Sequence, residues 1–119
     1  MSLGELSQKI REFADERDWG QFHSPRNLIF AIQAEVGELS ELVQWTSDAE
    51  LDGDWITRHR NRLGEEMADV LIYLVRLSDV LGVDLEAAAD DKIRLNGQKY
   101  PIEHARGNAK KYTEFEERH

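Results

Sequence analysis

The sequence predicts an all-α fold, a bundle built from four helices. Leu, Ala and Glu, which favour helices, are abundant, and the chain of 119 residues contains only two prolines. Apolar residues recur every three or four positions over long stretches, as they do along one face of an α-helix. At this length we expect a single domain, residues 1–119, with a modest core.

The first helix is predicted from Leu3 to about Arg17. Ser2, with Glu5 three positions later, fits a capping box at its start. The apolar positions that follow keep helical spacing: Leu3, Leu6, Ile10 and Phe13. They predict that one face of this helix packs against the core.

A loop is predicted from Asp18 to Ser24. Ser24 is expected to cap the second helix, with Pro25 in its first position. The loop carries three ring side chains: Trp19, Phe22 and His23. Such crowding indicates either a lid that stacks on a base or an anchor of the loop to the core, and the sequence leaves both interpretations open.

The second helix is predicted from Pro25 to about Trp45. Gly37 lies inside it at a local cost of about 1 kcal/mol relative to Ala, and such a glycine often permits close approach of another helix. Residues 46–56 are polar and lack periodicity, so we expect an exposed, mobile connection anchored by Trp55.

Thr57 is expected to cap the third helix, which runs to Leu81. Gly82 fits the position just past its end. Asp84 is expected to cap a fourth helix, from Leu85 to about Asn96, which Gly97 would end.

After about residue 101 the chain becomes basic, with Arg106, Lys110 and Lys111 close together. We expect this tail to be partly extended. It is either a flap over the phosphates of a ligand or a solvated segment that offsets the acidic body.

Two acidic pairs lie within the apolar stripes of the second and third helices. Glu35 falls in the middle of one stripe and Glu66 near the centre of the other, while Glu38 and Asp69 lie at the edges. The stripes are Leu28, Ile32, Leu39, Leu42 and Val43 in the second helix, and Leu63, Val70, Leu74, Leu77 and Leu81 in the third. A carboxylate in such a stripe faces the core, where an unpaired charge costs several kcal/mol or takes up a proton.

A divalent cation would compensate for these inward-facing charges. Residues three apart are neighbours on a helix surface, so each pair can hold an ion, and facing helices would bring the pairs together. Salt bridges to Arg or Lys are the alternative, and the central placement of Glu35 and Glu66 argues against them. Carboxylates without thiolates suit Mg²⁺, with Mn²⁺ as a second possibility.

Other metal and phosphate motifs are missing from this sequence. A di-iron bundle would need Glu-x-x-His on core helices, and the only such spacing is Glu116 to His119 at the C-terminal end. There is no Gly-Lys pair for a phosphate-binding P-loop and no His-Glu-x-x-His for a zinc protease.

Two Mg²⁺ ions a few ångströms apart would best serve in-line displacement at phosphorus. Glu41, three residues after Glu38, and Glu65, beside Glu66, are candidates for the catalytic base or for an additional ligand. The alternative for each is an ordinary surface acid.

Composition and charge limit the kinds of molecule that this protein is expected to bind. The formal charge of −9, from 24 acids and 15 bases, would repel a nucleic-acid backbone, whereas a polyphosphate that arrives with its metal ions would be attracted. The absence of cysteine fits a reducing compartment. No apolar run approaches the roughly 20 residues of a membrane span, and the N-terminus lacks a signal peptide, so we expect a soluble cytoplasmic protein.

These motifs carry a family resemblance that covers nearly the whole chain. Residues 35–41 (EVGELSE) and 65–70 (EEMADV) resemble the acid signature of the MazG-like all-α nucleoside triphosphate pyrophosphohydrolases. Further segments are similar to the dCTP pyrophosphatase branch: 17–19 (RDW), 21–23 (QFH), 25–28 (PRNL), 44–45 (QW), 69–74 (DVLIYL) and 110–114 (KKYTE).

The resemblance implies Mg²⁺-dependent hydrolysis of a deoxynucleoside triphosphate between its α and β phosphates, for nucleotide-pool control or sanitation. It implies the all-α NTP pyrophosphatase fold, assembled as a homodimer or homotetramer with the site near a subunit interface. The positions that match metal ligands are Glu35, Glu38, Glu66 and Asp69. Those that match base, sugar or phosphate contacts are Trp19, Gln21, Phe22, His23, Trp45, Tyr73, Lys92 and Asn96, and the tail residues Arg106 and Lys111 are candidates for the flap.

Helical spacing independently supports two of these positions. Tyr73 lies two turns after Glu66 and Trp45 two turns after Glu38, so both aromatics would project from the faces that hold metal. Ile10 is a departure, because the dCTP branch has a histidine there, and a lost hydrogen-bond partner can change which base is accepted.

We therefore predict a pyrophosphohydrolase for dCTP or a modified dCTP. A dUTP or broad-specificity NTP pyrophosphohydrolase is the second enzymatic possibility. A non-catalytic helical interaction module, with the acids as surface salt-bridge partners, is the alternative of another class.

Overall fold

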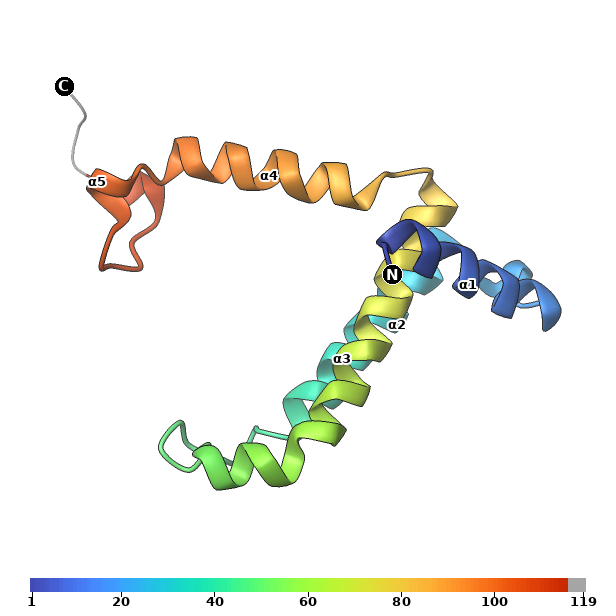
Figure 1. The fold of residues 1–119 in the computed structure, drawn as a ribbon, viewed down its shortest axis with the longest axis horizontal. Coiled ribbons are helices and arrows are strands. Elements are labelled where there is room, and N and C mark those ends of the chain that lie inside the picture. The colour runs from blue at the N-terminus through green and yellow to red at the C-terminus, as the bar shows by residue number, and fades with distance from the viewer. Residues whose placement is uncertain (116–119) are drawn as a thin grey trace. The chain divides into compact units, whose positions relative to one another are not determined.

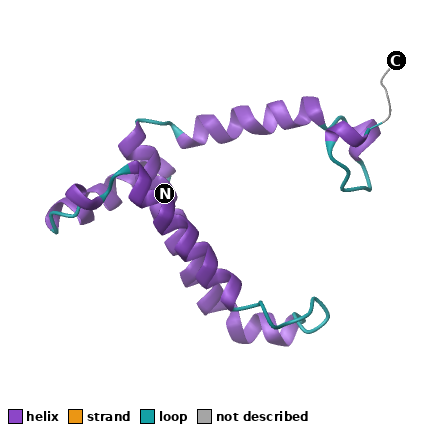
Figure 2. Cartoon of the chain, turned by 180° about the vertical axis from the view of Figure 1, so that it is seen from behind, coloured by secondary structure: helices purple, strands orange, loops and turns teal. Residues whose placement is uncertain are grey.

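The computed structural model describes residues 1–115, and all of its regular elements in that range are helical (Figures 1 and 2). The longer helices are α1 (Leu3–Glu16), α2 (Pro25–Glu41), α3 (Gly53–Leu81) and α4 (Leu85–Lys99). Three short elements complete them: the 3₁₀ turns η1 (Gly20–Phe22) and η2 (Tyr112–Glu114), and the single-turn helix α5 (Ile102–Ala105). The predicted all-α fold is confirmed.

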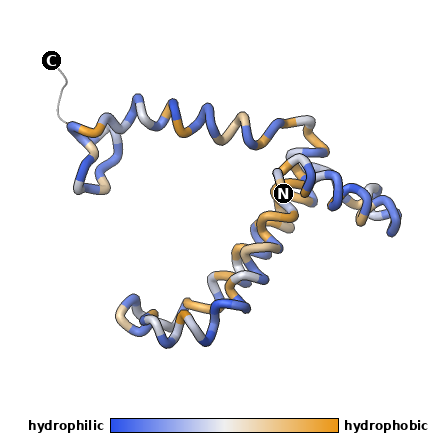
Figure 3. Tube along the Cα trace, in the orientation of Figure 1, coloured by the Kyte–Doolittle hydropathy of each residue, from blue (hydrophilic) through white to orange (hydrophobic). Residues whose placement is uncertain are grey.

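The chain forms two compact units, Met1–Val83 and a second that begins at Asp84. In the first unit, α2 packs along α3, and α1 also contacts α3. Leu28 on α2 and Val75 on α3 are fully buried there, together with Ala14 on α1. Figure 3 shows hydrophobic residues recurring along α3, as a helix packed on both neighbours requires. The expected single domain stays a prediction.

Local side-chain chemistry starts and ends several helices as the sequence predicts. The Ser2 hydroxyl accepts a hydrogen bond from the Glu5 amide and Ser24 accepts one from the Asn27 amide, both at 3.1 Å. The Asp84 carboxylate accepts one from the Ala87 amide at the start of α4. Gly82 ends α3 with φ of 69°, in the left-handed region that glycine adopts at little cost.

The predicted end of the second helix was wrong. α2 ends at Glu41, and residues 42–45 form turns instead. The amides of Leu42 and Val43 bond to carbonyls three residues earlier, Leu39 and Ser40, which tightens the chain and stops the helix. Trp45 therefore lies beyond α2, 88% exposed.

The predicted start of the third helix was also wrong. α3 begins at Gly53, because the Asp52 carboxylate accepts a hydrogen bond from the Trp55 amide at 2.9 Å. Thr57 lies inside the helix and donates its hydroxyl to the Gly53 carbonyl. Trp55 belongs to the first turns of α3, where its ring stacks on His59, rather than to the connection before it.

The fourth helix is longer than predicted. Gly97 does not end α4, which continues to Lys99. The Tyr100 amide still bonds to the Asn96 carbonyl at 2.8 Å, and the following Pro101 disfavours helical geometry at Tyr100. The helix therefore ends at the proline rather than at the glycine.

Candidate metal centre

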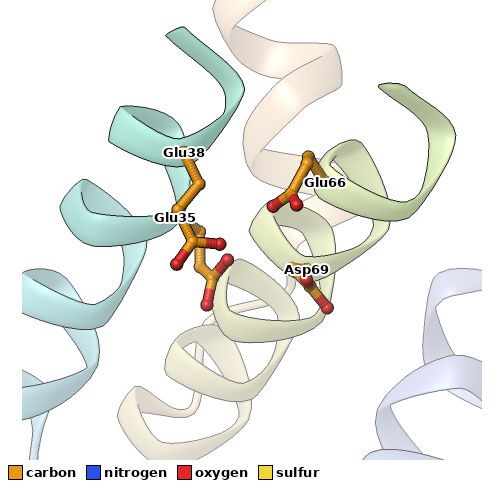
Figure 4. Close-up of side chains that lie close together, drawn as sticks. All are labelled: Glu35, Glu38, Glu66 and Asp69. Carbon is orange, nitrogen blue, oxygen red and sulfur yellow. The ribbon is translucent and has the colours of Figure 1, made fainter. Parts of the chain in front are cut away.

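Four carboxylates meet where α2 packs along α3. Glu35 and Glu38 come from α2, and Glu66 and Asp69 from α3, three residues apart in each helix. One oxygen from each lies within 4.8 Å of the others. Figure 4 shows the two α2 side chains projecting toward Glu66 on α3. The structure thus brings together the four acids that the sequence singled out as metal ligands.

Two oxygens of this cluster are buried without a hydrogen-bond partner. Glu66 is only 6% exposed and Glu35 is half-buried, whereas Glu38 and Asp69 are exposed. Within residues 1–115 the buried side-chain oxygens that lack a hydrogen-bond partner are Glu35 Oε2 and Glu66 Oε2. A buried carboxylate oxygen is normally paired with a donor or a cation. A cation is the missing partner that this geometry suggests.

The electrostatics of Glu66 indicate the same need. Burial raises the pKa of the Glu66 carboxyl, and the neighbouring Glu38 and Asp69 carboxyls raise that pKa further. Arg62 opposes the shift, because its Nε lies 3.2 Å from Glu66 Oε1. The alternative of a salt bridge to Arg or Lys is therefore correct for Glu66 Oε1. The ion pair still leaves Glu66 Oε2 without a hydrogen-bond partner.

The donor set fits a hard divalent cation. Mg²⁺ takes oxygen ligands at about 2.0–2.1 Å, so oxygens on opposite sides of one ion lie roughly 4 Å apart. Four carboxylate oxygens within 4.8 Å are already close to that dimension. Imidazole and thiolate ligands, which would favour other metals, are absent from the cluster. Glu116 and His119, the one Glu-x-x-His spacing, lie outside the described residues.

The two candidate bases do not belong to the four-acid cluster. Glu41 is the last residue of α2 and Glu65 lies on α3 next to Glu66; both are exposed. A part for either in proton transfer stays a prediction.

The loop between α1 and α2 is built around short-range contacts. The Trp19 ring packs edge-on against Phe13 of α1, with the ring centroids 5.6 Å apart, yet it remains 44% exposed. Gln21 donates to the carbonyl and carboxylate of Asp18, whose φ of 53° marks a tight turn. Phe22 is 59% exposed. The contact of Trp19 with Phe13 thus anchors the loop to α1, while part of its aromatic surface stays exposed.

His23 is held by an arginine that the sequence analysis missed. Arg76 on α3 is 8% exposed, and its Nε donates to His23 Nδ1 at 3.0 Å. Burial lowers the pKa of the His23 imidazole, and the Arg76 charge lowers it further. Arg76 is the only basic residue in the apolar segment 67–83. This isolated charge is the sequence feature that could have indicated a buried arginine.

The two aromatics expected beside the metal have different positions. Tyr73 is half-buried on α3, two turns after Glu66. Trp45 lies in the turns beyond α2, so the prediction that it projects from the helix face bearing Glu38 was wrong. Its contact with a base stays a prediction.

The remaining predicted phosphate-binding residues belong to the second unit. Lys92 and Asn96 are exposed on α4, and Arg106 and Lys111 are exposed after α5. An aromatic cluster orders this part of the chain: Tyr100 packs edge-on against Tyr112 and Phe115, and His104 stacks on Phe115. That these four residues contact phosphates stays a prediction.

Helix packing and the acid cluster together define an all-α protein with a candidate divalent-metal centre. Residues 30–115 match the family model described as the MazG-like family. The chain belongs to the MazG-like family. Among the described residues, no helix combines the length and apolarity that crossing a membrane requires.

Curated relatives and a solved structure agree with this assignment. The chain is 50% identical over 115 residues to dCTP pyrophosphatase 1 of Rattus norvegicus and 48% identical to that of Homo sapiens. Each alignment covers 96% of this chain and 68% of the relative. The crystal structure of a pyrophosphatase from Archaeoglobus fulgidus superposes with a TM-score of 0.78 at 41% identity, covering 82% of this chain and 91% of that one.

Proposed function

We propose that this chain is a nucleoside triphosphate pyrophosphohydrolase that converts dCTP, or a modified dCTP, to the monophosphate and pyrophosphate. The observation that carries the proposal is the cluster of Glu35, Glu38, Glu66 and Asp69, whose two orphaned buried oxygens need a cation. Support for the substrate comes from relatives named dCTP pyrophosphatase 1, about half identical over nearly the whole chain. Such an activity would serve nucleotide-pool control or sanitation.

The proposed cofactor is Mg²⁺, with Mn²⁺ as a substitute, held by the four clustered acids. When bound, the metal activates water and neutralises charge on the leaving phosphate oxygens. Attack of water on the α phosphorus forms a bond from phosphorus to the water oxygen. It breaks the bond from that phosphorus to the oxygen that bridges to the β phosphate, so that pyrophosphate leaves. Glu41 or Glu65 would accept the proton of the attacking water.

We assign the nucleoside contacts to the first unit. Trp19 and Phe22 offer exposed aromatic surface on which a base can stack, and Gln21 and His23 lie in the same loop. Tyr73 and Trp45 would complete the enclosure. In the second unit, the candidates for phosphate contacts are Lys92, Asn96, Arg106 and Lys111.

The proposed assembly is a homodimer or a homotetramer. Large apolar side chains remain exposed on both helices that carry the acids, including Phe30 at 51% and Met67 at 60%. Extensive exposed apolar surface on a soluble chain indicates an interface, and a second copy with the same surfaces would bury it.

Pyrophosphate release by the purified chain tests this function. We expect turnover of dCTP and 5-methyl-dCTP to exceed that of the other deoxynucleoside triphosphates. Glu35→Gln should reduce turnover about 100-fold or more, because it removes a charged metal ligand. Glu12→Gln, the same change on an exposed face of α1, is the matched control and should retain activity. Equal rates on every substrate would show a broad-specificity enzyme instead of a dCTP-selective one. No pyrophosphate release from any substrate would contradict the proposal that the chain is an enzyme.

A further inference from the structure

Arg76 is a buried charged group outside the acid cluster, and its contacts suggest a task. Arginine is almost never fully buried unless it is paired. At 8% exposure, Arg76 donates from Nε to His23 Nδ1 at 3.0 Å and from Nη1 to Asp79 Oδ2 at 3.1 Å. Gly20 lies near the guanidinium, since a Cβ there would be 3.8 Å from Nη2. The loop before α2 therefore lies close to this arginine.

Asp79 is fixed independently from the other side. Arg11 on α1 donates from Nη2 to Asp79 Oδ1 at 2.6 Å and from Nε to Oδ2 at 3.0 Å. Such two-point pairing gives a defined orientation as well as attraction. The sequence of contacts Arg11, Asp79, Arg76 and His23 thus joins α1, α3 and the loop before α2. Contacts within the protein therefore hold Arg76 in place.

The contact with Arg76 determines which nitrogen of His23 carries a proton. A guanidinium only donates hydrogen bonds, so His23 Nδ1 must accept. In the neutral imidazole the remaining proton then lies on Nε2. Burial and the Arg76 charge both lower the pKa of His23, which favours this neutral form. Nε2, on the other side of the ring, is therefore an N–H donor.

We propose that Arg76 is a positioning residue: it holds His23 as the Nε2–H tautomer, so that this N–H donates to a hydrogen-bond acceptor on the nucleoside of the bound substrate. The inference rests on the proposed function, in which His23 belongs to the nucleoside-binding loop. Without Arg76, the proton can move to Nδ1. Nε2 would then present a lone pair to the substrate and repel an acceptor there.

Nitrogen-15 NMR of histidine-labelled protein tests the tautomer directly, without nucleotide. The sequence contains four histidines, and His23→Gln identifies the signals of His23. We expect wild-type His23 to carry its proton on Nε2 at neutral pH. In Arg76→Met, which keeps the length but has no donor, we expect signal from the Nδ1–H form. Arg76→Lys, which can still donate to Nδ1, should restore the wild-type pattern.

Steady-state kinetics on dCTP supply the second readout. Arg76→Met should raise KM about tenfold, the effect of losing roughly one hydrogen bond, with kcat within about twofold. Arg11→Met is the matched control, because it removes the other arginine from Asp79 and leaves the contact between Arg76 and His23. It should change neither the tautomer nor KM.

Two results would overturn the inference and leave the proposed function standing. One is a wild-type His23 that carries its proton on Nδ1, which needs no variant to fold. The other is an Arg76→Met enzyme whose KM matches that of the wild type. Failure of the wild type to hydrolyse any deoxynucleoside triphosphate would instead overturn the proposed function, and the part of Arg76 in it.

Discussion

Within the acid cluster, the free-energy cost of burying an ionised carboxylate is concentrated at Glu66. Its pKa is raised above the ordinary value of 4.5 because it is buried among other carboxyls. The folded state therefore binds the Glu66 proton more tightly than the unfolded state does. Stability from this group is present at pH below 4.5 and is lost as pH rises through the folded-state pKa. At neutral pH the ionised, metal-free cluster opposes folding.

Glu66→Gln should consequently stabilise the metal-free protein at pH 7. The amide removes a buried negative charge, while its loss of the Arg62 ion pair is a smaller effect because Arg62 is mostly exposed. The advantage should disappear near pH 4, where the wild-type carboxyl is also neutral. Urea unfolding in the presence of a chelator at both pH values measures it. A variant less stable than the wild type at pH 7 would contradict this account.

His23 gives the opposite dependence on pH. Its pKa is lowered from 6.5, by burial first and by Arg76 second, so the unfolded state binds the proton more tightly. Its contribution to stability is complete above about pH 6.5 and declines as pH falls toward the folded-state value. Thermal melts between pH 7.5 and 5 should show the wild type losing more stability than His23→Gln. Parallel curves for the two proteins would exclude the effect.

At the scale of the elements, the packing of α2 on α3 positions the metal centre. Leu28 and Val75 are each 1% exposed, and Leu28 lies two turns before Glu35. Leu28→Ala should destabilise the fold by about 2–5 kcal/mol, through lost burial and the cavity left behind. Ile29→Ala, at an adjacent position that is 46% exposed, is the control and should cost much less. Urea denaturation compares them, and equal losses would show that α2 is packed differently.

How much of each element the sequence predicts depends on how local the cause is. The caps at Ser2, Ser24 and Asp84 were predictable because each uses an amide three residues away. The end of α2 was not, because Leu42 and Val43 continue the apolar stripe after the backbone has turned. The position of Trp45 was wrong for the same reason.

In the candidate site too, features with a local cause could be predicted from the sequence and a long-range contact could not. The gathering of the four acids follows from three-residue spacing within two apolar stripes, so the sequence could predict it. The contact between Arg76 and His23 joins residues 53 apart, and no local pattern indicates a partner at that separation. Helix spacing placed the four acids correctly because they lie within α2 and α3, whereas Trp45 lies beyond the end of α2 and its spacing did not apply. The long-range contact between Arg76 and His23 could not be predicted.

At the scale of the whole molecule, exposed apolar surface predicts self-association. A chain with a formal charge of −9 is protected from nonspecific aggregation, yet it leaves Phe30 and Met67 more than half exposed. Sedimentation at micromolar concentration should give a dimer or a tetramer. Phe30→Glu and Met67→Glu should shift the distribution toward monomer, because a charge in an apolar interface is costly. A wild-type monomer at that concentration would contradict this prediction.

If the four clustered carboxylates hold a divalent cation, Mg²⁺ stabilises the folded protein, and thermal melting with and without Mg²⁺ measures this effect. A cation that binds only the folded state stabilises it by about 2.7 kcal/mol at 100 times its Kd. We expect Mg²⁺ to raise the wild-type Tm in proportion to the logarithm of its concentration, and Glu35→Gln and Glu66→Gln to abolish the rise. A wild-type Tm that is the same in chelator, in Mg²⁺ and in Mn²⁺ would contradict it.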